Sequence, residues 1–340
     1  MNVDGEKGDN LRMERNLLVG NGINIQFGGK DVYSGCATMN RVVENIKAGK
    51  YTALAENSLS TEEQLEFLEG LVNVINQIRG KKLRGNAEGL FMVMELDRIS
   101  RTYPERSNVL SIFLEDYFLA FEIFNNGFRA EDGEEQSEKF RKIGFAFLRQ
   151  MIVDGIYNNG EINNVYKNFY PGMNKYLNRF SNIFTTNYDY NLESTLGSSE
   201  RICHLHGEFS KLAPEYSNTS LYYQEHKQEC KKLISNMIHG MEQCYSDAVM
   251  SWSWLDKYGE LIESETKYKE SLFKSIGGQL EVVGLAPAND EHLFLLISTN
   301  PKIKSVVYYY HNDEERNELP HHIKKPVTYK KAEKLWDSLK

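Results

Sequence analysis

The apolar positions of the first half of the chain follow two patterns, one typical of a buried strand and one of amphipathic helices. A run of branched apolar residues at 16–20 (NLLVG) predicts a buried strand. Farther along, Ser60 and Glu63 form the signature of a capping box, and apolar residues recur behind them at helical spacing. The same spacing predicts two more long helices at about 108–125 and 137–158. We therefore expect a helical segment after the first strand.

Strands return in the second half of the chain and alternate with helices. The apolar runs predict strands at 181–186, 201–205, 279–284 and 304–310, and helices near 226–244, 265–276, 290–299 and 329–339. Such alternation requires crossover connections and favours a parallel sheet. The predicted fold class is therefore α/β, a Rossmann-like open parallel sheet with a large helical insert or lobe.

The chain shows no Pro-rich linker, repeat or low-complexity tract that would divide it. Residues 1–12 are polar and charged and predict a flexible leader, with Met13 as an alternative start. Residues 13–340 are then expected to form one domain, with the helical insert at about 40–178.

Composition narrows the classes of partner. A chain of 340 residues that is 41% hydrophobic can bury a large core, and no window approaches the roughly 20 apolar residues of a membrane span. The 48 acidic and 40 basic residues give a net charge of −8 without a basic block, so we expect no direct nucleic-acid partner. The four cysteines form no Cys-x-x-Cys pair, which favours reduced thiols in a cytoplasmic protein and disfavours bound zinc.

Four polar or glycine-rich motifs stand where predicted strands end. They are GNGIN at 20–24, TTNYD at 185–189, HLHG at 204–207 and GLAP at 284–287. The carboxyl ends of parallel strands meet at one edge of an open sheet, which is where such folds bind ligands. The motifs therefore predict a nucleotide site at that edge.

The two glycine motifs would let the backbone approach a ligand. In GNGIN the amides at the start of the following helix favour an anion such as a pyrophosphate. The motif is not the dinucleotide fingerprint GxGxxG, because position 25 is Ile. For this loop or for GLAP taken alone, an ordinary turn between a strand and a helix is the favoured interpretation, and it is the four motifs together that predict a ligand site.

The TTNYD motif brings an amide and a carboxylate to one place. On extended chain Asn187 and Asp189 would share a face, and Tyr188 would point elsewhere. Helix capping by either residue is the alternative interpretation.

In HLHG, His204 and His206 alternate on a strand and would face the same side, with Gly207 allowing a turn. An imidazole exchanges protons near neutral pH, so His206 is a candidate base. Zinc binding lacks a third ligand at a suitable spacing, and a structural, hydrogen-bonded histidine is the alternative.

The order of these motifs resembles the sirtuin superfamily, and it is most similar to the sirtuin-like NAD-consuming proteins of bacterial antiviral defence. The resemblance covers the strand-end loops and not the helical insert. It implies that NAD is bound as a substrate, that Asn187 and Asp189 contact the nicotinamide ribose and that His206 is the catalytic base. The remaining contacts that it implies are Gly20, Asn21, Gly22, Ile23, Asn24 and Thr186 along the dinucleotide, and Gly284 and Leu285 on the adenosine side.

The departures from the family bear on the reaction. Protein-deacetylating sirtuins have alanine and serine where this chain has Asn21 and Asn24, and they carry a four-cysteine zinc module that is not evident here. The resemblance therefore implies an NAD+ glycohydrolase in anti-phage defence rather than a deacetylase, with no metal. Such an enzyme needs a switch, and we expect a homo-oligomer, a ring ATPase or a phage-derived trigger to supply it.

Two alternatives stay open. The first is a binding module that senses an NAD-derived nucleotide without cleaving it. The second is an abortive-infection protein of a related family whose first loop also reads GNG.

Overall fold

The computed structural model describes most of the chain. It covers residues 14–51, 59–80, 90–103, 105–114, 116–121, 123–124, 144, 147–148, 151–152, 154–205, 220–222, 232–234, 271–287 and 290–340.

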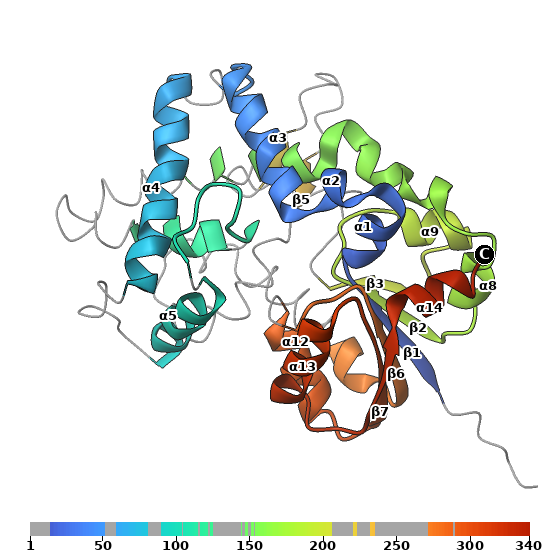
Figure 1. Cartoon of the computed structure of the whole chain (residues 1–340). Helices are drawn as coiled ribbons and strands as arrows, with labels where there is room; N and C mark the ends of the chain where they lie inside the picture. Colours follow the sequence, from blue (N-terminus) through green and yellow to red (C-terminus); the bar gives the residue numbers. More distant parts are fainter. Residues whose placement is uncertain are drawn as a thin grey trace, which may run out of the picture.

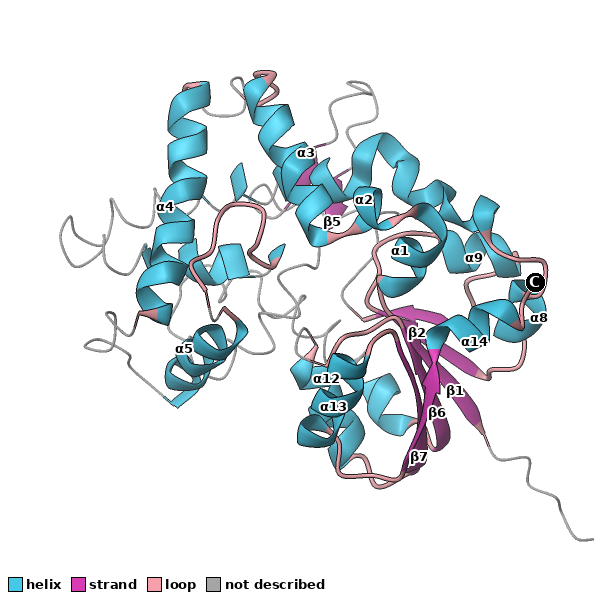
Figure 2. Cartoon of the chain, in the orientation of Figure 1, coloured by secondary structure: helices cyan, strands magenta, loops and turns pink. Residues whose placement is uncertain are grey.

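A six-stranded parallel sheet, with helices packed around it, forms one part of the molecule (Figure 2). Its strands lie in the order β3-β2-β1-β6-β7-β8, and every neighbouring pair is parallel. The strands are β1 (Arg15–Val19), β2 (Asn182–Thr185), β3 (Ile202–His204), β6 (Gly278–Val283), β7 (Ile303–Tyr310) and β8 (Val327–Lys331). Numbered consecutively within the sheet, this is the order 3-2-1-4-5-6 of doubly wound nucleotide-binding folds. The predicted Rossmann-like α/β class is confirmed.

Helices cover both faces of the sheet (Figure 1). Successive residues of a strand point to opposite faces, so Leu17 joins one buried cluster and Leu18 joins the other. The first cluster lies under α1 (Gly22–Gly28), α8 (Met173–Leu177) and α14 (Ala332–Asp337), and the second under α12 (Glu291–Thr299) and α13 (Asp313–His322). A sheet buried on both faces explains the continuous apolar runs in its central strands.

A group of helices outside the sheet has a hydrophobic core of its own (Figure 1). The core draws on α3 (Gly35–Lys47), α4 (Thr61–Arg79), α5 (Leu90–Thr102) and the segments around 112–121 and 147–152. At the start of α4 the predicted capping box is present, since Ser60 Oγ accepts from the Glu63 amide and the Glu63 carboxylate accepts from the Ser60 amide. We call this group the helical lobe.

The lobe returns to the sheet through the 3-10 helix η2 (Asn158–Asn168). Asn159 and Gly160 have positive φ there, which produces the kink inside η2. Ile162 belongs to the core of the lobe, whereas Met173 on α8 already belongs to the core of the sheet. The short helix α2 (Lys30–Tyr33) makes the outward connection from α1 to α3.

Some predicted elements were wrong. A helix was expected over 226–244, but Lys232–Ile234 is a strand, β5, that pairs antiparallel with β4 (Ser220–Tyr222). The C-terminal helix begins at Ala332, and the start of its predicted range belongs to β8. The helix predicted at 137–158 falls largely outside the described residues.

Several elements were missed, among them α13 and β8. The helix α13 is polar except for the buried Leu319 and contains Pro320, so it has no apolar stripe to announce it. The strand β8 lies at the edge of the sheet and has no run of buried residues. Among the described helices, none has the length and apolarity that crossing a membrane requires.

Candidate functional site

The loops after β1 and β6 pack directly on each other. The amide of Gly20 donates to Val283 O at 2.9 Å, and the amide of Gly22 donates to Gly284 O at 2.9 Å. A Cβ at Gly22 would lie 2.5 Å from Cα of Gly284, and Gly284 has a φ of +72°. These glycines therefore allow two loops to meet at the carboxyl edge of the sheet, and the Gly22 amide already has a protein acceptor.

The other residues assigned to the dinucleotide lie around these loops in different environments. Ile23 and Leu285 are buried in the clusters on opposite faces of the sheet. Thr186 donates its amide to Val19 O at 3.0 Å, which extends the contact of β2 with β1. Asn21 is exposed and donates its side-chain amide to Tyr33 O at 2.8 Å. Only Asn24 is buried and turned toward the TTNYD motif.

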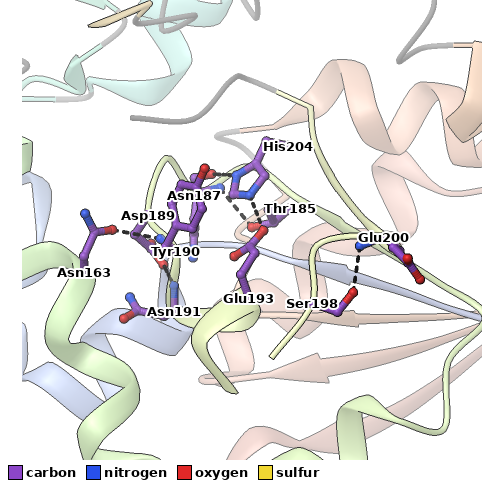
Figure 3. A network of polar contacts seen from close by, with 10 residues as sticks. All are labelled: Asn163, Thr185, Asn187, Asp189, Tyr190, Asn191, Glu193, Ser198, Glu200 and His204. Atoms are coloured by element: carbon purple, nitrogen blue, oxygen red, sulfur yellow. Dashed lines mark hydrogen bonds and ion pairs between the residues drawn. The ribbon is translucent and has the colours of Figure 1, made fainter. Parts of the chain in front are cut away.

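Asn24 and Asp189 meet across 165 residues of sequence. Asn24 Nδ2 donates to Asp189 Oδ2 at 2.7 Å, and the Asn191 amide donates to Asp189 Oδ1 at 3.0 Å. Asn191 Nδ2 donates to Asn24 Oδ1 at 3.2 Å, which closes a ring of hydrogen bonds among three residues, with the backbone amide of Asn191 as one of its donors (Figure 3 shows Asp189 and Asn191). The start of α1 and the TTNYD motif are thus joined by buried hydrogen bonds.

Asp189 is a buried carboxyl group, 2% exposed. Burial raises its pKa above the ordinary value, and the donors from Asn24 and Asn191 oppose that rise only in part. Asp189 Oδ1 accepts from the backbone amide of Asn191, the first residue of α9 (Asn191–Leu196), but the N-cap residue of that helix is Tyr190, which makes no side-chain cap. Asp189 therefore supports the start of α9 from the residue before the N-cap, and it keeps its contact with Asn24.

Asn187 has the least satisfied side chain of the motif. It is 6% exposed, and neither Nδ2 nor Oδ1 has a hydrogen-bond partner among the described residues. A buried polar group left unpaired costs about 1–3 kcal/mol. The backbone of Asn187 is held in place by contrast, because its backbone N–H donates to Thr185 Oγ1 at 3.0 Å. A fixed backbone that carries an unpaired side-chain amide is the arrangement expected of a group that binds a ligand.

His204 ends β3 beside Asn187 (Figure 3). One ring nitrogen, Nδ1, lies 2.7 Å from Asn187 O, and the other, Nε2, lies 2.7 Å from Glu193 Oε1 on α9. The ring stacks on Tyr190 with centroids 6.2 Å apart. His204 is therefore a buried, hydrogen-bonded histidine. His206, the predicted base, and Gly207 lie outside the described residues.

The 187–191 segment is also held from the side of the helical lobe. Asn163 Oδ1 accepts from the Tyr190 amide at 2.8 Å (Figure 3), and Asn191 Nδ2 donates to Ile162 O at 2.8 Å. The side chain of Tyr188 packs against the core of the lobe. The segment that carries Asn187 is thus fixed between the sheet and the lobe.

Sequence reasoning missed Glu193 and Asn191. Glu193 is 7% exposed although it is a charged residue, and the apolar positions of its short helix are Leu192 and Leu196, so its burial leaves no mark in the sequence. Its position one turn after the TTNYD motif is the only local signal. Asn191 is the first residue of α9 and follows the N-cap Tyr190, so the N-cap preference for asparagine does not mark it.

Comparison with known protein families and with curated proteins found no match, so the function has to be inferred from the site. In the part of the chain that the structure describes, no three His, Cys, Asp or Glu side chains are grouped so that they could hold a metal ion.

Proposed function

We propose that this protein is an NAD+ glycohydrolase. The reaction would break the bond between nicotinamide and C1 of the ribose, and water would supply the hydroxyl group of the ADP-ribose product and release a proton. The single observation that carries the proposal is the side-chain amide of Asn187, which is buried and unpaired in an otherwise hydrogen-bonded loop.

The position of this amide favours a nucleotide. The sheet has the doubly wound order, and folds of this order bind nucleotides outside the carboxyl ends of their strands. Asn187 follows β2 and His204 ends β3, so both lie at that edge. The motif resemblance to NAD-consuming proteins then suggests which nucleotide is bound.

The residues would divide the work as follows. Asn187 has a free donor and a free acceptor, which suit a ribose hydroxyl or the attacking water. Asp189 would hold Asn24 and the start of α9 in place, since both of its oxygens already accept hydrogen bonds. His206 would accept the proton from water, a role worth about 10²–10⁴ in rate.

The two docked glycine loops limit what they can contribute. Because the Gly22 amide is bonded to Gly284 O, the pyrophosphate would have to be bound by other groups of these loops. Gly20, Gly22 and Gly284 would then shape the edge of the site, and the Gly22 amide would not donate to the ligand.

The biological setting is part of the proposal. Uncontrolled loss of NAD+ would be toxic, so we propose activity in bacterial anti-phage defence that is switched on by oligomerisation or by a partner such as a ring ATPase or a phage-derived trigger. The helical lobe contacts the site loop through Tyr188 and Ile162, which gives such a trigger a physical route.

The test is nicotinamide release from NAD+ by the full chain, measured over a range of protein concentrations so that self-association is sampled. Wild type should release nicotinamide, and Asn187→Ala should lose at least 100-fold in rate and also bind NAD+ more weakly by calorimetry. Asn178→Ala is the matched control, because Asn178 is exposed and precedes the opposite end of β2. A wild type that binds NAD+ without cleaving it, both alone and with the proposed trigger added, would assign the site to the binding module instead, and one that does neither would refute the proposal.

A further inference from the structure

His204 and Glu193 are two buried ionisable side chains for which the proposed reaction has no direct use. They are 4% and 7% exposed, and they come from different elements, β3 and α9. Their contact at 2.7 Å is matched by a second contact of the same length between His204 and Asn187 O. The imidazole therefore bridges a carboxylate and the backbone of the residue with the unpaired amide (Figure 3).

The partners determine where the protons lie. A backbone carbonyl oxygen can only accept, so His204 Nδ1 carries a hydrogen that it donates to Asn187 O. Nε2 and Glu193 Oε1 must then share one further proton, either as imidazolium with carboxylate or as imidazole with carboxylic acid. The neutral tautomer with hydrogen on Nε2 alone is excluded, because the lone pair of Nδ1 would then face the backbone carbonyl oxygen of Asn187.

The result is a backbone held on both sides of one α-carbon. Thr185 Oγ1 accepts from the backbone N–H of Asn187, and His204 Nδ1 donates to the backbone carbonyl of Asn187. These two groups belong to the two peptide units that flank the Asn187 α-carbon, so the contacts fix its φ and ψ. The side-chain amide has no partner of its own, and its direction therefore depends on that backbone.

We propose that Glu193 and His204 are positioning residues that hold the side-chain amide of Asn187 in the orientation that binds the nucleotide. This inference rests on the proposed function and extends it. Glu193 fixes the tautomer and ring direction of His204, and His204 fixes the Asn187 carbonyl. Neither residue touches the reacting atoms, so the effect of each passes through Asn187.

The test compares two replacements of His204 that differ in hydrogen bonding. In His204→Asn the side-chain Nδ2 lies near the former position of Nδ1 and can still donate to Asn187 O, whereas His204→Leu offers no donor. A small misplacement of a binding group can cost about 10²-fold in rate. We expect nicotinamide release to fall about 100-fold in His204→Leu and no more than about 10-fold in His204→Asn.

A second pair probes Glu193 and covers the case in which a His204 variant fails to fold. Glu193→Gln can donate its amide to Nε2 of a neutral imidazole and should stay within about 10-fold of wild type, whereas Glu193→Ala should lose more. Circular dichroism and thermal unfolding establish that each compared variant is folded. If wild type binds NAD+ but does not cleave it, the same order is expected in the affinity measured by calorimetry.

The outcomes separate this inference from the proposed function. ¹⁵N chemical shifts of the His204 ring in the nucleotide-free protein should show a protonated Nδ1. A neutral tautomer with hydrogen only on Nε2, or equal turnover by the Asn and Leu variants in an enzyme that cleaves NAD+, would overturn the positioning role alone. A wild type that neither binds nor cleaves NAD+ would overturn the proposed function and this inference with it.

Discussion

Asn187 and Asn300 are two asparagines of equal burial and opposite hydrogen bonding, and together they test whether Asn187 serves a ligand or the fold. Both are 6% exposed. Asn300 Nδ2 donates to Lys274 O at 3.1 Å and to Ile276 O at 3.2 Å, and its Oδ1 accepts from the Lys302 amide at 2.9 Å. The Asn187 side chain makes no such contact with a described residue.

The magnitudes follow from these contacts. Replacing Asn187 by leucine, an apolar side chain of similar branching, removes an unpaired buried amide whose desolvation costs about 1–3 kcal/mol. We expect Asn187→Leu to leave the free energy of unfolding unchanged or to raise it by up to about 2 kcal/mol, after about 1 kcal/mol of repacking. Asn300→Leu strips three groups of their partner and should lower it by about 3 kcal/mol or more.

Urea unfolding of the unliganded proteins, followed by circular dichroism, measures both values, and thermal shift with NAD+ adds the functional half. Wild type and Asn300→Leu should be stabilised by NAD+ to the same degree, whereas Asn187→Leu should be stabilised less. If Asn187→Leu is destabilised as much as Asn300→Leu, the amide has a structural partner and the reasoning from its unpaired state fails.

Two further predictions concern the carboxyl and the glycines of the site. Burial raises the pKa of Asp189 above 3.8, so its contribution to stability is greatest when it is protonated and is lost as the pH rises through the raised pKa. The free energy of unfolding of wild type minus that of Asp189→Asn should therefore fall as the pH rises above about 4 in denaturant titrations, and a rise would contradict the raised pKa. Gly22→Ala should cost about 1–3 kcal/mol by the same assay, because its Cβ would meet the Gly284 backbone at 2.5 Å, whereas Gly35→Ala, with open space around it, should cost nothing measurable. Equal stability of the two glycine variants would show that the loops can move apart.

Hydrophobic pattern was enough to predict the centre of the sheet. The strands β1, β2 and β6 are covered on both faces, so each reads as an apolar run that stops at a polar or glycine motif. Pattern fails where burial is one-sided or absent. The edge strand β8 alternates partly buried and exposed residues, and α13 buries little besides Leu319.

The sequence was enough to predict that the motifs lie at one edge of the sheet, but it did not predict the contacts among them. The motifs that carry Asn187 and Asp189 stand at strand ends, and the parallel sheet brings strand ends together. The pairing of Asn24 with Asp189 and the burial of Glu193 depend on how α1 and α9 pack, which no local spacing encodes. The docking of Gly20 and Gly22 on Gly284 likewise needed the register of β1 with β6.

The role of Asn187 is tested most directly by following its side-chain NH₂ resonance while NAD+ or ADP-ribose is added to the ¹⁵N-labelled protein. The resonance is identified by its loss in Asn187→Leu. We expect it to shift on addition of nucleotide and to saturate together with binding, since the side-chain amide gains its first partners. A resonance that stays unchanged while the protein binds or cleaves NAD+ would show that Asn187 does not contact the nucleotide.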